Sequence, residues 1–182
     1  EKGRQAAQFL AEQMLSRQMQ RLVMLVDKNT AAGAQQCVRA LITALHGDYP
    51  RIQVLEQLEI NDHYSVDDFE KLYRRYPEMQ GLFIQNAGAA ARISGWLHAN
   101  RRDDVVVVTS QINVAQRMLQ VTSGRMGIVS SRPIEMGHLM VYSAACALLG
   151  KPTPKYVSVD PITLNQRNVE ELWPLLTQSR LK

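Results

Sequence analysis

An unbroken run of four valines, Val105–Val108, is the feature of this sequence that most restricts the fold. A strand with one wet face alternates apolar and polar side chains, whereas this run has no polar position and is typical of burial on both faces. Similar runs recur at a spacing of roughly 20–30 residues, which fits a strand followed by a returning helix. The runs lie at 21–26, 52–60, 81–85, 105–110 and 126–131. The pattern predicts an α/β protein with a doubly wound parallel sheet.

The segments between the runs carry helix start and stop signals. The segment 65–77 begins with Ser65 as an N-cap, has Asp68 three residues later, and ends at Pro77. The segment 31–47 follows two candidate caps, Asn29 and Thr30, and ends at Gly47, a residue common after helices.

A third helix is predicted over 133–152, with Pro133 in its first turn and Gly150 as its stop. Methionine-rich stripes at helical spacing are usually core positions, so we expect one face of this helix to pack tightly. That face consists of Met136, Leu139, Met140, Ser143 and Ala147.

Composition narrows the class of protein. The chain has 182 residues, 46% hydrophobic and 21% charged, which suits a single globular domain without a membrane span. The formal net charge is +4, but the basic residues are scattered, so this chain itself is not expected to bind nucleic acid. Cys37 and Cys146 lie in apolar, helix-like stretches and are interpreted as small buried hydrophobes in a reducing compartment, although two cysteines could pair.

The sequence gives no sign of an enzyme, a metal site or a cofactor. The four histidines, at 46, 63, 98 and 138, show no metal-ligand spacing and no accompanying carboxylate cluster. The nucleophile-elbow, paired-cysteine and phosphate-loop motifs are missing. The Gly/Ala-rich corner at 86–95 has Gly88 and Gly95 but lacks the three closely spaced glycines of a dinucleotide fingerprint. We therefore interpret this corner as the rim of a binding cleft.

The predicted fold indicates where a ligand would bind. Ligands of open parallel sheets sit beyond the carboxyl ends of the strands. The side chains expected there are amides, hydroxyls and a few charges, a mixture that suits a sugar or polyol. The candidate ligand-binding residues are Asp27, Lys28, Gln85, Asn86, Ser110, Gln111, Ser131 and Arg132. Asn61, Asp62 and His63 also follow a strand but are weaker candidates. Any of these residues could instead cap the helix that follows it.

The order of these pieces resembles a known family. Residues 103–172 are similar to the effector-binding core shared by periplasmic sugar-binding proteins and by transcriptional regulators of the lac and galactose repressor type. The opening stretch 3–13 resembles the helix that begins the second lobe of that family. The matching positions are Val105–Val108, Ala115, Leu119, Gly124, Ile128, Pro133, Met136–Gly137, Leu148, Leu149–Gly150, Pro152, Pro161, Ile162, Thr163 and Asn168–Val169.

The resemblance implies a type I periplasmic-binding-protein-like fold, with residues 1–182 forming mainly its C-terminal lobe. A first lobe, and the DNA-binding domain or signal peptide of the family, would precede residue 1. In the family, the strand near 126–130 and the helix over 134–149 return to that first lobe. Closure of the two lobes on a ligand would then be the signal.

The sequence departs from the family at the ligand edge. Amides at Gln85 and Asn86, and Ser110–Gln111, stand where many members have carboxylates. Ser131 and Arg132 replace a common glutamine, and the arginine usual after the first strand is missing. These departures put a standard pentose or hexose in question, and Arg132 would suit an acidic ligand or form an ion pair at the hinge.

The resulting hypothesis is the sugar-sensing domain of a cytoplasmic, dimeric repressor. Its partners would be a small sugar-like effector and operator DNA, the latter bound through a domain outside this chain. A sequence isoelectric point near 9.2 and the two cysteines favour this reading. The alternative is a periplasmic sugar-binding protein of an ABC transporter.

Overall fold

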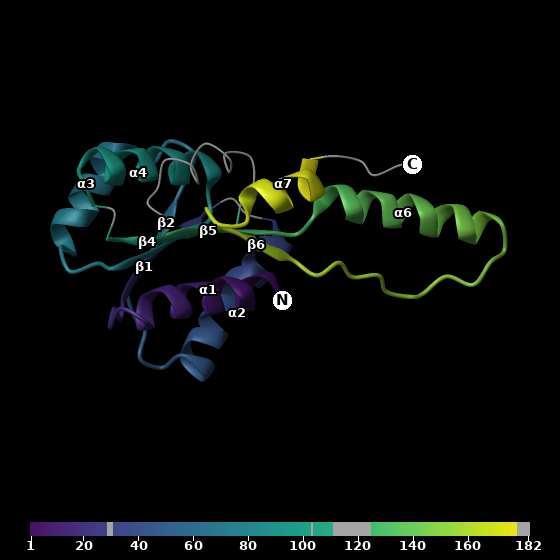
Figure 1. The fold of residues 1–182 in the computed structure, drawn as a ribbon, viewed down its shortest axis with the longest axis horizontal. Coiled ribbons are helices and arrows are strands. Elements are labelled where there is room, and N and C mark those ends of the chain that lie inside the picture. Colours follow the sequence, from purple (N-terminus) through teal and green to yellow (C-terminus); the bar gives the residue numbers. More distant parts are fainter. Residues whose placement is uncertain (29–30, 103, 111–124, 178–182) are drawn as a thin grey trace.

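Five parallel strands and one antiparallel strand form the sheet on which this chain is built, as the computed structural model shows (Figure 1). The structure describes residues 1–28, 31–102, 104–110 and 125–177. The strand order is β2-β1-β3-β4-β5-β6, with β6 antiparallel to β5. The elements are α1 (Lys2–Leu15), β1 (Arg21–Asp27), α2 (Ala32–Asp48), β2 (Gln53–Ile60), α3 (Val66–Arg75), β3 (Gly81–Ile84), α4 (Ala87–Ala99), β4 (Val106–Thr109), β5 (Met126–Ser130), α6 (Pro133–Leu148), β6 (Ile162–Leu164) and α7 (Val169–Thr177). The predicted doubly wound α/β fold is confirmed.

Helices cover both faces of the sheet, and successive side chains of β4 pack alternately into two apolar cores. Val106 and Val108 pack with α1 and α2, whereas Val105 and Val107 pack with α3, α4 and α7 (Figure 1). All four valines are 3% exposed or less, as the unbroken run predicts. Among the described residues, no helix is long and apolar enough to cross a membrane.

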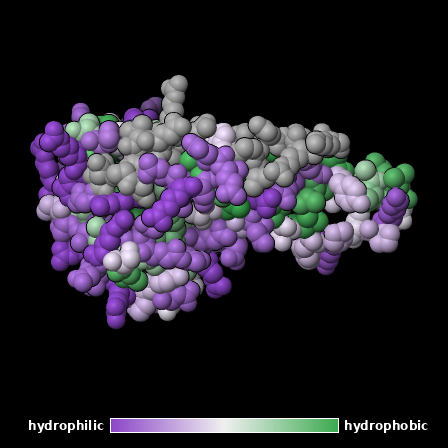
Figure 2. Space-filling model, in the orientation of Figure 1, coloured by the Kyte–Doolittle hydropathy of each residue, from purple (hydrophilic) through white to green (hydrophobic). Residues whose placement is uncertain are grey.

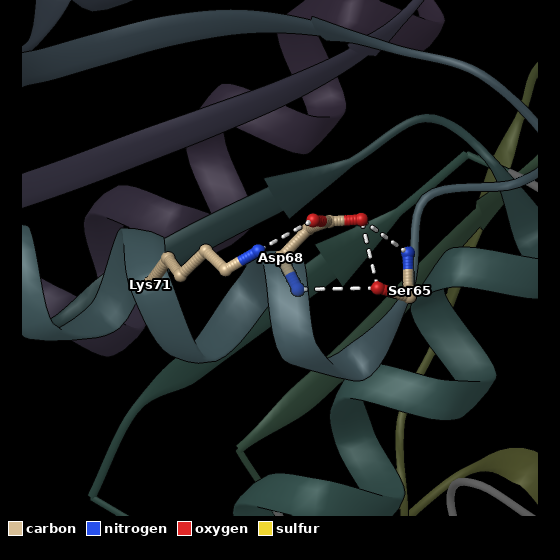
Figure 3. Close-up of polar contacts among 3 residues, drawn as sticks. All are labelled: Ser65, Asp68 and Lys71. Carbon is tan, nitrogen blue, oxygen red and sulfur yellow. Dashed lines mark hydrogen bonds and ion pairs between the residues drawn. The ribbon is translucent and has the colours of Figure 1, made fainter.

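The N-cap predicted at Ser65, with Asp68 three residues later, is present as a capping box at the start of α3 (Figure 3). The Ser65 hydroxyl accepts a hydrogen bond from the Asp68 backbone N–H at 3.2 Å, and the Asp68 carboxylate accepts from the Ser65 backbone N–H, also at 3.2 Å. Lys71 lies 3.5 Å from the same carboxylate. The Ser65 hydroxyl also donates to Asp68 Oδ2 at 2.7 Å, and this hydrogen bond, followed by the one from the Ser65 backbone N–H, holds the pKa of Asp68 below its usual value.

The structure differs from the sequence analysis in the ends of α2, in the strand β6 and in the burial of α6. The helix α2 runs one residue past Gly47 and ends at Asp48, and its N-cap is Ala31; Asn29 and Thr30 lie outside the described residues. The strand β6 was not predicted, because three residues at a sheet edge give no readable periodicity.

The largest difference concerns α6. The predicted ends are confirmed, since Pro133 opens the helix and Gly150, at φ +67°, turns the chain back. The predicted buried face is wrong, because none of its residues is buried. The helix projects away from the layered body beside the returning segment 149–161 (Figure 1).

Close packing of α1 on α2 depends on Gly3. A Cβ at this position would overlap the carbonyl oxygen of Cys37 and lie 2.7 Å from the Leu41 backbone nitrogen. Gly95, in α4, faces open space instead. Helix propensity alone favours alanine at both positions, so the two sites separate propensity from packing.

We therefore expect Gly3→Ala and Gly95→Ala to change stability in opposite directions. Gly3→Ala should lower the free energy of unfolding by about 1–3 kcal/mol, the usual cost of overpacking. Gly95→Ala should raise it by roughly 0.5–1 kcal/mol. Urea unfolding of both variants measures this, and an equal effect of the two substitutions would contradict the packing described here.

The capping box makes a pH-dependent contribution. A carboxyl group with a depressed pKa in the folded state stabilises the protein above its unfolded pKa and loses that contribution as the pH falls through the folded value. Ser65→Ala should cost about 1 kcal/mol at neutral pH. It should also raise the pKa of Asp68 toward its unfolded value, so the difference in stability between variant and parent should be largest at neutral pH and should shrink as the pH falls through the carboxyl range. Urea midpoints of the parent and the variant, measured from about pH 2.5 to about pH 7, test this, because the interval includes the pH range over which aspartate titrates.

Candidate ligand-binding site

Asn86 holds two carboxylates together at the carboxyl edge of the sheet. Its Nδ2 donates to Asp62 Oδ1 at 2.7 Å and to Asp27 Oδ2 at 3.2 Å. Its Oδ1 accepts from the Ala89 backbone N–H at 2.9 Å and so caps α4. Asn86 is 7% exposed, and these three hydrogen bonds fix the orientation of its amide. The Asn86 amide, just after β3, therefore links Asp27 at the end of β1 to Asp62 in the loop after β2.

Gln85 is buried next to this site and hydrogen-bonds to Asp27. Its side chain is 1% exposed, its Oε1 accepts from the Asp27 backbone N–H at 3.0 Å, and its Nε2 donates to the Ala34 carbonyl at 3.1 Å. The amide is thus used to join the end of β1 to the first turn of α2. Gln85 therefore positions Asp27 in this structure.

Arg92, in α4, is a member of the site that the sequence did not indicate. Its Nη2 donates to the Tyr64 carbonyl at 2.9 Å and to the Asp62 carbonyl at 3.2 Å. These hydrogen bonds hold the loop after β2 against α4 and place Asp62 beside Asn86. Gly88 gives the arginine room, since a Cβ there would lie 3.3 Å from Arg92 Nη1. The small residue one helical turn before the arginine was the available signal.

Ser110, Ser131 and Arg132 lie along the same edge, at the ends of β4 and β5. The Ser110 carbonyl accepts from Lys2 Nζ at 2.6 Å, and burial lowers the pKa of this lysine. Ser131 and Arg132 connect β5 to α6 and are half-buried. Gln111 lies outside the described residues.

Arg132 is engaged with its own helix. It is the N-cap of α6 in a left-handed conformation, φ +53°, and its guanidinium pairs with Glu135. Its backbone N–H donates to Ser130 Oγ at 3.3 Å. Arg132 thus forms an ion pair, one of the two roles that the sequence left open, with a residue of its own helix. A left-handed non-glycine residue before proline is a strained connection.

The structure therefore brings Asp27, Asn86 and the less favoured Asp62 into direct contact, with exposed Lys28 directly after Asp27. Within the described part of the chain, no group of three or more acidic, histidine or cysteine side chains could hold a metal ion. The exposed Asp62 carboxylate and the half-buried Asp27 carboxylate offer hydrogen-bond acceptors, and such charge-assisted bonds to hydroxyl donors are strong.

Comparison with known proteins identifies the fold. No protein-family model matches the chain. No curated protein matches it in sequence.

Solved structures do match. A carbohydrate-transporter solute-binding protein from Agrobacterium radiobacter in complex with D-arabinose has 18% identity and a TM-score of 0.80, over 97% of this chain and 62% of that one. A sugar-binding protein of a sugar ABC transporter from Bacillus halodurans has 15% identity and a TM-score of 0.80, over 93% and 62%. A periplasmic solute-binding protein from Actinobacillus succinogenes with bound D-allose has 17% identity and a TM-score of 0.77, over 92% and 60%.

The chain spans less than two thirds of the length of each of these neighbours. At these identities the likeness concerns the fold and leaves the ligand open. The chain has the α/β fold of periplasmic-binding-protein-like sugar-binding structures, and its 182 residues fit one lobe of that fold.

Proposed function

We propose that this chain is the second lobe of a two-lobed binding protein and that its carboxyl edge binds a small sugar. The observation that carries the proposal is the Asn86 amide held between Asp27 and Asp62. A capping residue needs only its side-chain oxygen, which accepts from the Ala89 N–H. The additional use of Nδ2 to hold two carboxylates at a sheet edge suits a binding surface, where ligands of open parallel sheets sit.

The charges at this edge favour a neutral ligand rich in hydroxyl groups. Carboxylates only accept hydrogen bonds, so they select hydroxyl donors. An acidic or phosphorylated ligand would meet the charges of Asp27 and Asp62, while Arg132 is already paired with Glu135. A pentose, a hexose or a close derivative therefore fits better than a sugar phosphate.

The second wall of the cleft would come from a body built around α6. The chain leaves the carboxyl end of β5 at Ser130 and continues directly into α6, so this helix starts at the edge that carries Asn86. A lobe assembled around it would face the site. Ligand held between two such lobes would favour the closed arrangement.

A solute-binding protein of a sugar transporter is the first candidate for the whole protein. It is supported by the fold neighbours, among them proteins solved with D-arabinose and D-allose. Such a protein would act outside the cytoplasm and would hand its sugar to a membrane transporter.

A sugar-responsive transcriptional regulator is the second candidate, supported by two free cysteines, Cys37 and Cys146. That protein would be a cytoplasmic dimer with operator DNA as a partner. The mass of the full-length protein in solution, measured by light scattering, separates the two: a monomer supports the transport protein and a dimer the regulator.

Titration calorimetry of the full-length protein tests the sugar site. Among pentoses, hexoses and their phosphates, we expect at least one neutral sugar to bind. Asp62→Ala should weaken that binding roughly tenfold or more, the loss typical of a hydrogen bond to a charged group. The matched control is Asp48→Ala, which removes an exposed carboxylate at the end of α2, on the opposite edge of the sheet.

Two outcomes would contradict the proposal. One is the absence of heat with every neutral sugar, and the other is an equal loss of affinity for Asp62→Ala and Asp48→Ala. Tighter binding of a sugar phosphate than of its parent sugar would overturn the assignment of a neutral ligand.

A further inference from the structure

The amino ends of the parallel strands form a second edge of the sheet, opposite the candidate ligand-binding site, and arginine gathers along it. These cations are spread over residues 17–125, so they look scattered in the sequence, but β1 to β5 all begin at this edge. Six of them are exposed, two are half-buried, and no lysine lies among them. The arginine edge consists of Arg17, Arg21, Arg51, Arg74, Arg75, Arg101, Arg102 and Arg125.

Few carboxylates lie along the arginine edge. The acidic residues described there are Asp48, Glu78 and Asp104, and Asp103 lies outside the described residues. Asp104 is already engaged, since its two oxygens accept from Arg102 Nε and Nη2 at 2.9 and 3.1 Å. In the described part of the chain, no carboxylate pairs with Arg17, Arg21, Arg51 or Arg101. The edge therefore keeps an excess of positive charge.

Hydrogen bonds between neighbouring strands hold this edge in one shape. The Gln80 side chain, at the start of β3, accepts through Oε1 from the backbone N–H groups of Gln20 and Arg21 at 2.8 and 3.3 Å. The Gln80 carbonyl accepts from the Val106 N–H at 2.9 Å and so joins β3 to β4. Neighbouring strands lie about 4.8 Å apart, so the amino ends from β2 to β5 span about 20 Å.

Arg101 occupies a position that favours glycine. At the end of α4, the Arg101 N–H donates to the His98 carbonyl at 3.0 Å and the Arg102 N–H to the Leu97 carbonyl at 2.8 Å, a Schellman ending. Such an ending needs one left-handed residue, and here it is Arg101, with φ +54°. Glycine adopts this conformation without strain, whereas a side chain costs stability. An exposed arginine kept in a strained conformation points to a contact that needs its charge.

The surroundings of the edge indicate the kind of partner. Protein interfaces have an apolar core, and membrane-surface binding uses inserted apolar side chains. The exposed large hydrophobic side chains of the described residues all lie within 136–157. Figure 2 shows hydrophilic side chains over the end of the body opposite α6. Single-stranded nucleic acid stacks on exposed rings, but Tyr73 and Tyr76 are half-buried and lie under the guanidinium groups of Arg102 and Arg75, at 4.8 and 5.2 Å.

We propose that the arginine edge is a sequence-independent contact for the phosphate backbone of duplex DNA. Guanidinium groups match phosphate oxygens with two parallel hydrogen bonds, and phosphate contacts supply most of nonspecific DNA binding. Phosphates follow each other at about 3.4 Å per strand along the duplex axis, so an edge of about 20 Å runs beside roughly six of them. The contact lies outside the sugar site. It accords with the regulator among the two candidates for the whole protein, because a solute-binding protein outside the cytoplasm would not meet the chromosome.

Fluorescence anisotropy of a labelled duplex of arbitrary sequence, titrated with the full-length protein without sugar, tests the contact. Arg101→Gly should weaken binding roughly fivefold or more at about 0.1 M salt, and should make the plot of log affinity against log salt less steep by about 1, since one phosphate contact is lost. The same substitution relieves the left-handed strain, so the Tm should stay the same or rise by roughly 2–4 °C. Weaker binding by a variant of undiminished stability separates a lost contact from a lost fold.

The matched control is Arg39→Gln, at an exposed position in the middle of α2, which should change neither the affinity for DNA nor its salt dependence. Absence of duplex binding, or equal losses for Arg101→Gly and Arg39→Gln, would overturn the proposal. Tighter binding of polyglutamate, single-stranded DNA or duplex RNA than of the DNA duplex would also overturn it, because the edge would then select another polyanion. Sugar binding by Arg101→Gly should equal that of the parent, so failure of the arginine edge and failure of the sugar site are distinguishable.

Discussion

Burial of the central strands on both faces is the constraint on which the rest of the structure depends. Successive residues of β4 alternate between two apolar cores, one under α1 and α2 and the other under α3, α4 and α7. Polar chemistry therefore has no place on the sheet faces and is confined to the strand ends. Because β1 to β5 are parallel, their carboxyl ends meet at one edge. The meeting of Asp27 and Asn86 follows from this topology.

The fold was predictable because its signals are local. The strand runs, the Ser65–Asp68 capping box and the ends of α6 at Pro133 and Gly150 each depend on a few neighbouring residues. The exact helix ends were less predictable, since α2 passes Gly47 by one residue. The antiparallel β6 was missed because three residues at an edge are held by pairing with β5, which a local pattern does not report.

The site was predictable only in part, because its geometry depends on loops. The meeting of Asp27 and Asn86 follows from strand order alone. The roles of Asp62 and Arg92 depend on how the loop after β2 folds back onto α4, which is decided by two hydrogen bonds to carbonyl groups. Gln85 was placed correctly at the edge, but its amide is turned inward to Asp27 and Ala34. Strand order predicts which residues meet, and the hydrogen bonds decide which of them can face a ligand.

The arm formed by α6 and the returning segment 149–161 shows the difference between the need for burial and the partner that satisfies it. Met136 and Met140 have the spacing typical of a core helix, but no residue of α6 is buried in the structure. The two ends of α6 are specified locally, by the Arg132–Glu135 pair and the Schellman ending at Gly150, so the arm needs no second body to define its shape. Its direction is set at Ser131 and Arg132, directly beyond the sheet edge that carries Asn86. Any body that covered the start of the arm would therefore lie next to the sheet edge that carries Asn86.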